Sequence, residues 1–149
     1  MASNKTIKQI LTALYDTLTA SPSLAPATVK QIVKGVDADT SLGFPFVRIY
    51  LVSPASALAD NLPSYERTHT FAVEILQEAV NKSKQNAEED FCTAIEGVLN
   101  RLNGTWQLGI GVENCEIQPS TVSNQEMSGA LMRVCRITVQ VTTLVENPS

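Results

Sequence analysis

The segments Phe44–Val52 (FPFVRIYLV) and Glu66–Gln77 (ERTHTFAVEILQ) decide the fold of this chain, and the polar stretch Ser53–Tyr65 separates them. In both segments apolar residues recur at every second position, which is the period of a strand with one buried face. The residues that share a face are Val47, Ile49 and Leu51 in the first segment and His69, Phe71, Val73 and Ile75 in the second. We therefore predict two strands of one sheet, joined by a projecting loop.

Two further segments show the spacing of amphipathic helices. In Thr6–Ala20 apolar residues recur every three or four positions, so this segment is predicted to be a helix that covers the sheet. A second helix is predicted to start near Asn86, three residues before Glu89, and to end before Gly104. The helix dipole favours the acidic residues Glu88–Asp90 in its first turn. No histidine or second carboxylate group lies at a spacing that would make them a metal or acid–base site.

Three other segments are predicted to be strands. The β-branched run Val29–Val36 is the first, Val112–Gln118 is short, and Gly129–Glu146 is a long last strand with one packed and one polar face. Fully extended, this last segment would span about 60 Å, so it must bend, bulge or run past its own domain to meet a neighbour. We favour a bend plus an overhang. Arg133 falls on the apolar side, which is what a bulge near Met132–Val134 would produce.

Length and charge limit the classes of protein to which this chain can belong. A chain of 149 residues with 44% hydrophobic content suits one domain over 1–149 that buries about two-thirds of its unfolded surface. The balance of 15 acidic against 11 basic residues gives a net charge of −4, which argues against tight binding to many phosphates. No apolar run approaches the length of a membrane span, so we expect synthesis in the cytoplasm and no membrane partner.

The residues with chemical potential do not form a catalytic pattern. His69 is the only histidine, so a histidine metal cluster or a Ser-His-Asp triad is not supported, and we predict a structural role for it. The glycines of Asn103–Gly111 match neither dinucleotide nor P-loop spacing. A hydrolase that uses Ser53 or Cys92 would lack a credible base. We predict no catalytic, cofactor-binding or metal-binding residues, and therefore no enzyme.

The cysteines and the lone tryptophan have simpler interpretations. The three cysteines lack CxxC spacing and fall within predicted helices or strands, so we expect buried, reduced thiols. They are Cys92, Cys115 and Cys135. Trp106 either packs where the second helix ends or anchors a partner.

Three polar connections are long enough to project from the sheet and contact a partner: Asp37–Gly43, Ser53–Tyr65 and Pro119–Ser128. The second carries leucines among small and polar residues, a composition that orders readily against another protein. The acids of these loops lack the spacing of an EF-hand and are predicted to be solvated. The candidate protein-interface residues are Asp37, Asp39, Leu42, Leu58, Asp60, Leu62, Tyr65, Arg67, Gln125, Met127, Arg136 and Gln140.

The order of elements resembles that of the tail terminator proteins of long-tailed bacteriophages, the lambda-type terminator included. The likeness covers nearly the whole chain. It rests on the helix Thr6–Ala20 leading to Val29–Gly35, the FPFV start at Phe44–Val47, the Glu66-Arg67 pair that opens an alternating strand, and the C-terminal strand rich in Thr and Val. The resemblance implies an α+β fold, with a mostly antiparallel sheet of four to five strands and two amphipathic helices packed on one face.

The resemblance also implies a function without a cofactor. Six copies would close into a ring on the last ring of the tail tube, stop its growth, and offer the opposite surface to head-completion or neck proteins. Such a protein lies in the virion, at the head-proximal end of the tail, and genomic DNA passes through its opening without specific binding. An acidic subunit would suit that passage.

Two other interpretations stay open from the sequence. A neck or head-completion protein, or a minor tail subunit, would share the small α+β size and the ring assembly. A small ferredoxin-like ligand-binding domain would need a concave apolar pocket with convergent polar groups, and the sequence shows no obvious cluster of that kind.

Overall fold

Pairing between the two alternating segments forms the middle of the sheet. In the computed structural model, β2 (Phe46–Ser53) and β3 (Ser64–Glu78) are antiparallel neighbours, as the sequence predicts. The structure describes residues 6–20, 29–36, 45–54, 64–78, 87–103, 114–118, 120–127 and 130–146. Within these ranges the other strands are β1 (Gln31–Lys34), β4 (Asn114–Ile117), β5 (Thr121–Met127) and β6 (Ala130–Glu146), and the helices are α1 (Ile7–Thr19) and α2 (Ala87–Asn103).

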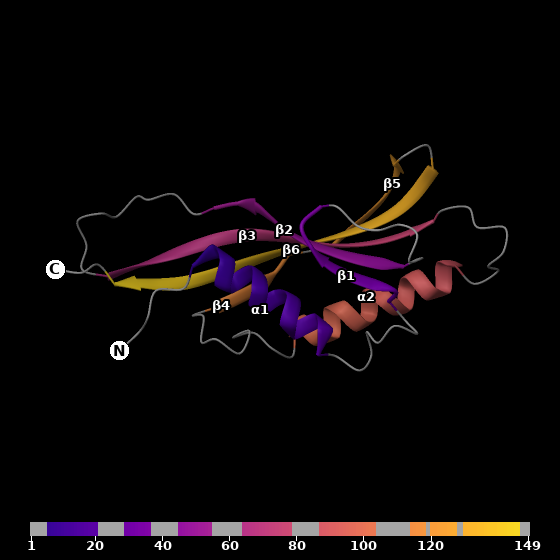
Figure 1. Cartoon of the computed structure of the whole chain (residues 1–149). Coiled ribbons are helices and arrows are strands. Elements are labelled where there is room, and N and C mark those ends of the chain that lie inside the picture. The colour runs from indigo at the N-terminus through magenta and orange to yellow at the C-terminus, as the bar shows by residue number, and fades with distance from the viewer. Residues whose placement is uncertain are drawn as a thin grey trace.

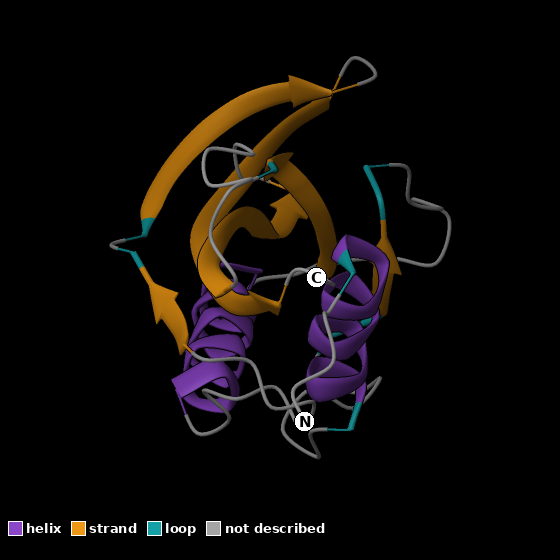
Figure 2. Cartoon of the chain, turned by 90° about the vertical axis from the view of Figure 1, so that its left-hand side faces the viewer, coloured by secondary structure: helices purple, strands orange, loops and turns teal. Residues whose placement is uncertain are grey.

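The six strands form one mostly antiparallel sheet. Their order is β1-β2-β3-β6-β4, and β5 pairs with β6 on the same side as β4. Only β1 and β2 run parallel. The two helices cover one face of the sheet, so the predicted α+β class is confirmed (Figures 1 and 2). The described part of the chain has one strand more than the four to five expected, and that strand is β5.

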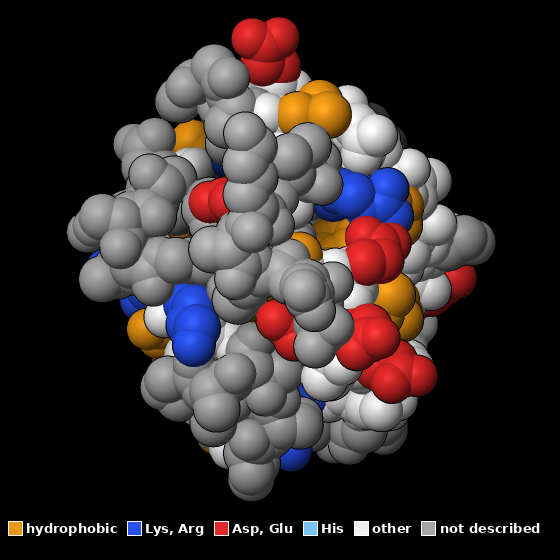
Figure 3. All heavy atoms as spheres, turned by 90° about the vertical axis from the view of Figure 1, so that its right-hand side faces the viewer, with side chains coloured by type: hydrophobic (Ala, Val, Ile, Leu, Met, Phe, Trp, Pro, Cys, Tyr) orange, Lys and Arg blue, Asp and Glu red, His pale blue; other side chains and the backbone are white. Residues whose placement is uncertain are grey.

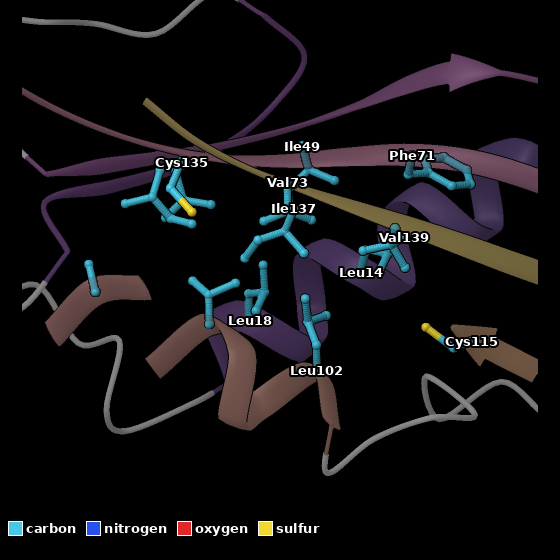
Figure 4. Close-up of a cluster of buried hydrophobic side chains, with 14 of the residues drawn as sticks. Leu14, Leu18, Ile49, Phe71, Val73, Leu102, Cys115, Cys135, Ile137 and Val139 are labelled. Atoms are coloured by element: carbon cyan, nitrogen blue, oxygen red, sulfur yellow. The ribbon is translucent and has the colours of Figure 1, made fainter. Parts of the chain in front are cut away.

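The hydrophobic core lies between the helices and the sheet. Leu14 and Leu18 of α1 and Leu102 of α2 point toward Ile137 and Val139 of β6 (Figure 4). All five are almost completely buried. Burying side chains of this size contributes roughly 1.5–3 kcal/mol each before the entropy of ordering them is subtracted. The alternating apolar residues of β2 and β3 lie in the same core, so the alternation in these two strands identifies the buried face of the sheet.

The capping of α1 explains where this helix begins. The Thr6 hydroxyl accepts a hydrogen bond from the Gln9 amide at 3.1 Å, and the Gln9 side chain accepts one from the Thr6 amide at 2.8 Å. This capping box satisfies two amides that the first turn would otherwise leave free. At the other end, Arg101 of α2 donates to the Thr17 carbonyl at 2.9 Å and joins the two helices.

The outer face of the sheet is not uniformly polar, which corrects the expectation for the last strand. Phe46, Leu76, Met132 and Val134 form a second buried cluster on the face away from the helices. Because β6 is buried on both faces here, the alternation of its apolar residues breaks down. The sequence pattern at this point reflects two-sided burial.

The predicted bulge near Met132–Val134 is wrong for the same reason. The register between β3 and β6 runs without a break from Ser64 opposite Glu146 to Glu78 opposite Met132. Arg133 does lie on the helix-facing side, opposite Gln77, but the strand is regular there. The irregularity lies instead in β2, where the register shifts between Leu51 and Ser53.

The segment expected to be the polar connection Pro119–Ser128 contains a strand. Residues Thr121–Met127 form β5, which pairs antiparallel with the first half of β6 from Thr121 opposite Arg136 to Met127 opposite Ala130. All of its side chains from Thr121 to Glu126 are exposed. The backbone ladder to β6 holds this strand in place, and burial of a face contributes little.

Some predictions fall outside the described residues. Asn86, Gly104, Trp106 and most of the glycine-containing stretch Asn103–Gly111 are among them. Neither helix in the described ranges combines the length and apolarity needed to span a bilayer.

Candidate functional site

The outer face of the sheet carries a row of charged residues across three strands. Glu74 of β3 lies between Arg48 of β2 and Arg136 of β6 in the register. The Arg48 Nε lies 2.6 Å from the Glu74 Oε1, and only 3% of Glu74 is exposed. Alternating side chains of neighbouring strands point to one face, which places all three charges together.

Tyr50 completes this charged row. Its hydroxyl hydrogen-bonds to Glu74, and the Arg48 guanidinium lies 5.9 Å from the centre of its ring. Burial, followed by the negative charge of Glu74, raises the pKa of the Tyr50 hydroxyl above its ordinary value. The carboxylate of Glu74 therefore has two partners within the chain, Arg48 and Tyr50.

Arg136 is the third charged member of the row, and the residue is partly exposed. Its Nε is buried and has no hydrogen-bond acceptor among the described residues. Two and four positions along, Thr138 and Gln140 continue the same polar region, and the side chain of Gln140 accepts a hydrogen bond from Gln118 at 3.2 Å. Two predicted interface residues, Arg136 and Gln140, thus lie on one strand and one face.

The other predicted interface residues do not gather at one place. Tyr65 and Arg67 lie on β3, and Arg67 belongs to the helix-facing side together with His69. Gln125 and Met127 lie on β5, in a strand and not in a loop. The remaining six lie outside the described residues and are Asp37, Asp39, Leu42, Leu58, Asp60 and Leu62.

Sequence reasoning missed a contact that joins the start of α2 to the end of the sheet. The Arg133 guanidinium lies 2.6 Å from the Glu88 Oε1, 5.5 Å from the centre of the Phe91 ring, and 3.4 Å from the Asn124 Oδ1. Seen from this end, acidic and basic side chains lie among apolar ones (Figure 3). Glu88 thus has a structural partner as well as a favourable place in the helix dipole.

The only histidine and two of the three cysteines lie buried on the helix-facing side of the sheet. His69 is 4% exposed, and burial together with the charge of Arg67 lowers its pKa. Burial raises the pKa of the Cys115 thiol to about 11 and also raises that of Cys135. Both thiols are therefore protonated at neutral pH, a state of low nucleophilicity. Cys92 is exposed, which corrects the expectation that all three would be buried, and all three are free thiols.

Across the described ranges, no group of three or more His, Cys, Asp and Glu side chains is arranged to hold a metal ion. The acidic cluster at the start of α2 is used by the helix end and by Arg133. The described surface also has a partly exposed polar sheet face and strand edges at β1 and β5.

The comparisons with known proteins concern the fold. No protein-family model and no curated protein matches the sequence. Among solved structures, the chain is similar to one in the virion of a native gene transfer agent (GTA) particle, with a TM-score of 0.60. The similarity covers 89% of this chain and 93% of that chain at 14% sequence identity. The two chains therefore share a fold over nearly their whole lengths.

Proposed function

We propose that this chain is a structural virion protein of a tailed, phage-like particle, and that it is a tail terminator. In this role its copies close into a ring on the last ring of the tail tube, stop tube growth, and offer a surface to the head-completion or neck proteins. The observation that carries the proposal is the near full-length likeness to a chain of a GTA virion. The resemblance of the element order to tail terminators supports the finer assignment independently.

The surface of the chain supports a role in assembly. Its charged row is occupied by its own ion pair, and its buried thiols and histidine face the core side. Arg136, Thr138 and Gln140 are partly exposed on the outer face, where their polar groups can bind another protein through hydrogen bonds. The proposed activity is therefore assembly, without catalysis and without a cofactor.

Charge and symmetry are compatible with a ring around DNA. The net charge of −4 disfavours retention of a polyanion that must slide through the opening. Subunits that meet through two different surfaces form closed rings when the rotation between neighbours closes. The copy number of six follows from the family resemblance and is part of the proposal.

A reconstitution assay tests this function. The tail tube protein of the same particle is polymerised with its tape-measure protein, with and without the purified chain, and tube lengths are measured by electron microscopy. We expect the chain to bind one tube end and to narrow the length distribution. Tubes of unrestricted length that carry no bound chain would contradict the proposal.

A neck or head-completion protein would behave differently in the same material. Immunogold labelling of separated heads and tails distinguishes the two roles, because a terminator stays with headless tails. Label found on filled heads and absent from headless tails would assign the chain to the neck.

A further inference from the structure

The sheet has two different outer edges, and they lie on opposite sides of the molecule. β1 forms one edge, and β4 with β5 forms the other (Figure 2). In the described part of the chain, no strand pairs with the outer side of β1 or β5. An edge strand presents N–H and C=O groups to a further strand, so each edge is a template for pairing.

The β5 edge lacks three of the devices that protect edge strands from pairing, namely lysine, proline and a bulge. Its sequence, TVSNQEM, contains neither lysine nor proline, and its register with β6 has no bulge. Half of the Val122 side chain is exposed, and Leu131 on the same side of the β5–β6 hairpin is 47% exposed. An isolated hairpin edge of this kind is stabilised when another strand covers it.

The two edges carry opposite charges. The edge of β4 and β5 has Glu116 and Glu126, both exposed, and no basic residue in its described part. The described residues 29–36 around β1 have Lys30 and Lys34, both exposed, and no acidic residue. Each edge also has a half-exposed valine, Val122 on β5 and Val36 after β1. The edges of one molecule are thus complementary to each other, while two copies of the same edge would repel.

We propose that β5 of one copy adds to the β1 edge of the next copy, so that the sheet continues from subunit to subunit. This inference rests on the proposed ring and names its contact surface. The partner is a second copy of this chain. A contact between two different edges runs head to tail in one direction, which is the type of contact that a closed ring requires.

The first test places a charge on the β5 edge. Sedimentation velocity over a range of concentrations compares the wild type with Val122→Lys and with Val52→Lys, a matched control at a valine that is 43% exposed near the end of β2. We expect Val122→Lys to weaken self-association at least tenfold, since the new positive charge on β5 would face the basic β1 edge of the next copy. Val52→Lys should assemble like the wild type. Circular dichroism confirms that each variant is folded.

A charge exchange tests the pairing of the two edges and does not depend on Val122→Lys being folded. Glu126→Lys and Lys30→Glu change exposed side chains, and each alone should assemble less well than the wild type. An equal mixture should recover rings, because alternating copies place each lysine opposite a glutamate. A mixture that assembles no better than the separate variants would overturn the proposal.

The outcomes separate this inference from the proposed function. If Val122→Lys and Glu126→Lys form the same rings as the wild type, the proposed β5 contact is ruled out and the proposed ring is unaffected. If the wild-type chain stays monomeric at every concentration, both the proposed ring and the proposed edge contact are ruled out.

Discussion

Glu74 holds the centre of the outer sheet face because its carboxylate has two partners. Arg48 pairs with it at 2.6 Å and Tyr50 hydrogen-bonds to it, while almost none of it is exposed. Removal of one member of a buried ion pair leaves the other charge uncompensated, and this is more destabilising than replacement of both.

We predict that Glu74→Gln lowers the free energy of unfolding by about 3 kcal/mol, since Arg48 then lacks its counter-charge. The double variant Arg48→Met/Glu74→Leu should lose less than Glu74→Gln because it removes both charges. Urea denaturation at pH 7 measures both. A Glu74→Gln variant within about 0.5 kcal/mol of the wild type would show that the pair is unimportant.

His69 predicts a dependence of stability on pH. Burial and Arg67 lower its pKa in the folded state, so between that pKa and about 6.5 the unfolded chain binds more protons. Stability is therefore complete above about pH 6.5 and falls as the pH drops through the folded pKa. As the only histidine in the sequence, His69 is the side chain whose ordinary pKa lies in this range.

The measurement is the free energy of unfolding between pH 7.5 and 5 for the wild type and His69→Gln. The variant should show a flatter curve over this interval, whatever its stability at pH 7.5. Two parallel curves would mean that another group causes the loss.

At the scale of elements, the capping box of α1 is the simplest contribution to test. Both hydrogen bonds between Thr6 and Gln9 are present, and both residues are exposed. We predict that Thr6→Ala lowers the free energy of unfolding by about 1 kcal/mol, because the Gln9 amide loses its acceptor. Lys8→Ala, an exposed position in the same turn, is the control and should change stability by a few tenths at most. Equal losses in the two variants would rule out a specific cap.

The elements that bury one face could be predicted from the sequence. The two helices, β2 and β3 all show a period that burial imposes, and the structure confirms them. β5 could not be predicted in this way because neither of its faces is buried. Because β6 is buried on both faces at Met132 and Val134, its apolar residues do not alternate there, and this break was interpreted as a bulge. That interpretation assumed that one face of the strand is exposed to water.

The polar contacts depended on distances that the sequence does not contain. Arg133 and Glu88 are 45 positions apart in the chain, and only the meeting of α2 with β6 brings them to 2.6 Å. Arg136 and Gln140 could be assigned to a polar strand face because they alternate with core residues. Gln125 and Met127 were predicted to contact a partner from a loop, and the structure places both in the strand β5.

At the scale of the whole molecule, the proposed ring depends on a difference in charge between the two edges of the sheet. An acidic edge at β5 and a basic edge at β1 give each copy one surface of each kind. Copies with two such surfaces assemble in one direction, and they either close into a ring or continue as a filament. The chain shares its fold with a chain in the virion of a GTA particle.

Electron microscopy of the purified chain, imaged alone over a range of concentrations, tests the central claim most directly. The account predicts closed rings whose class averages have sixfold symmetry. Particles that remain single copies at every concentration would contradict it.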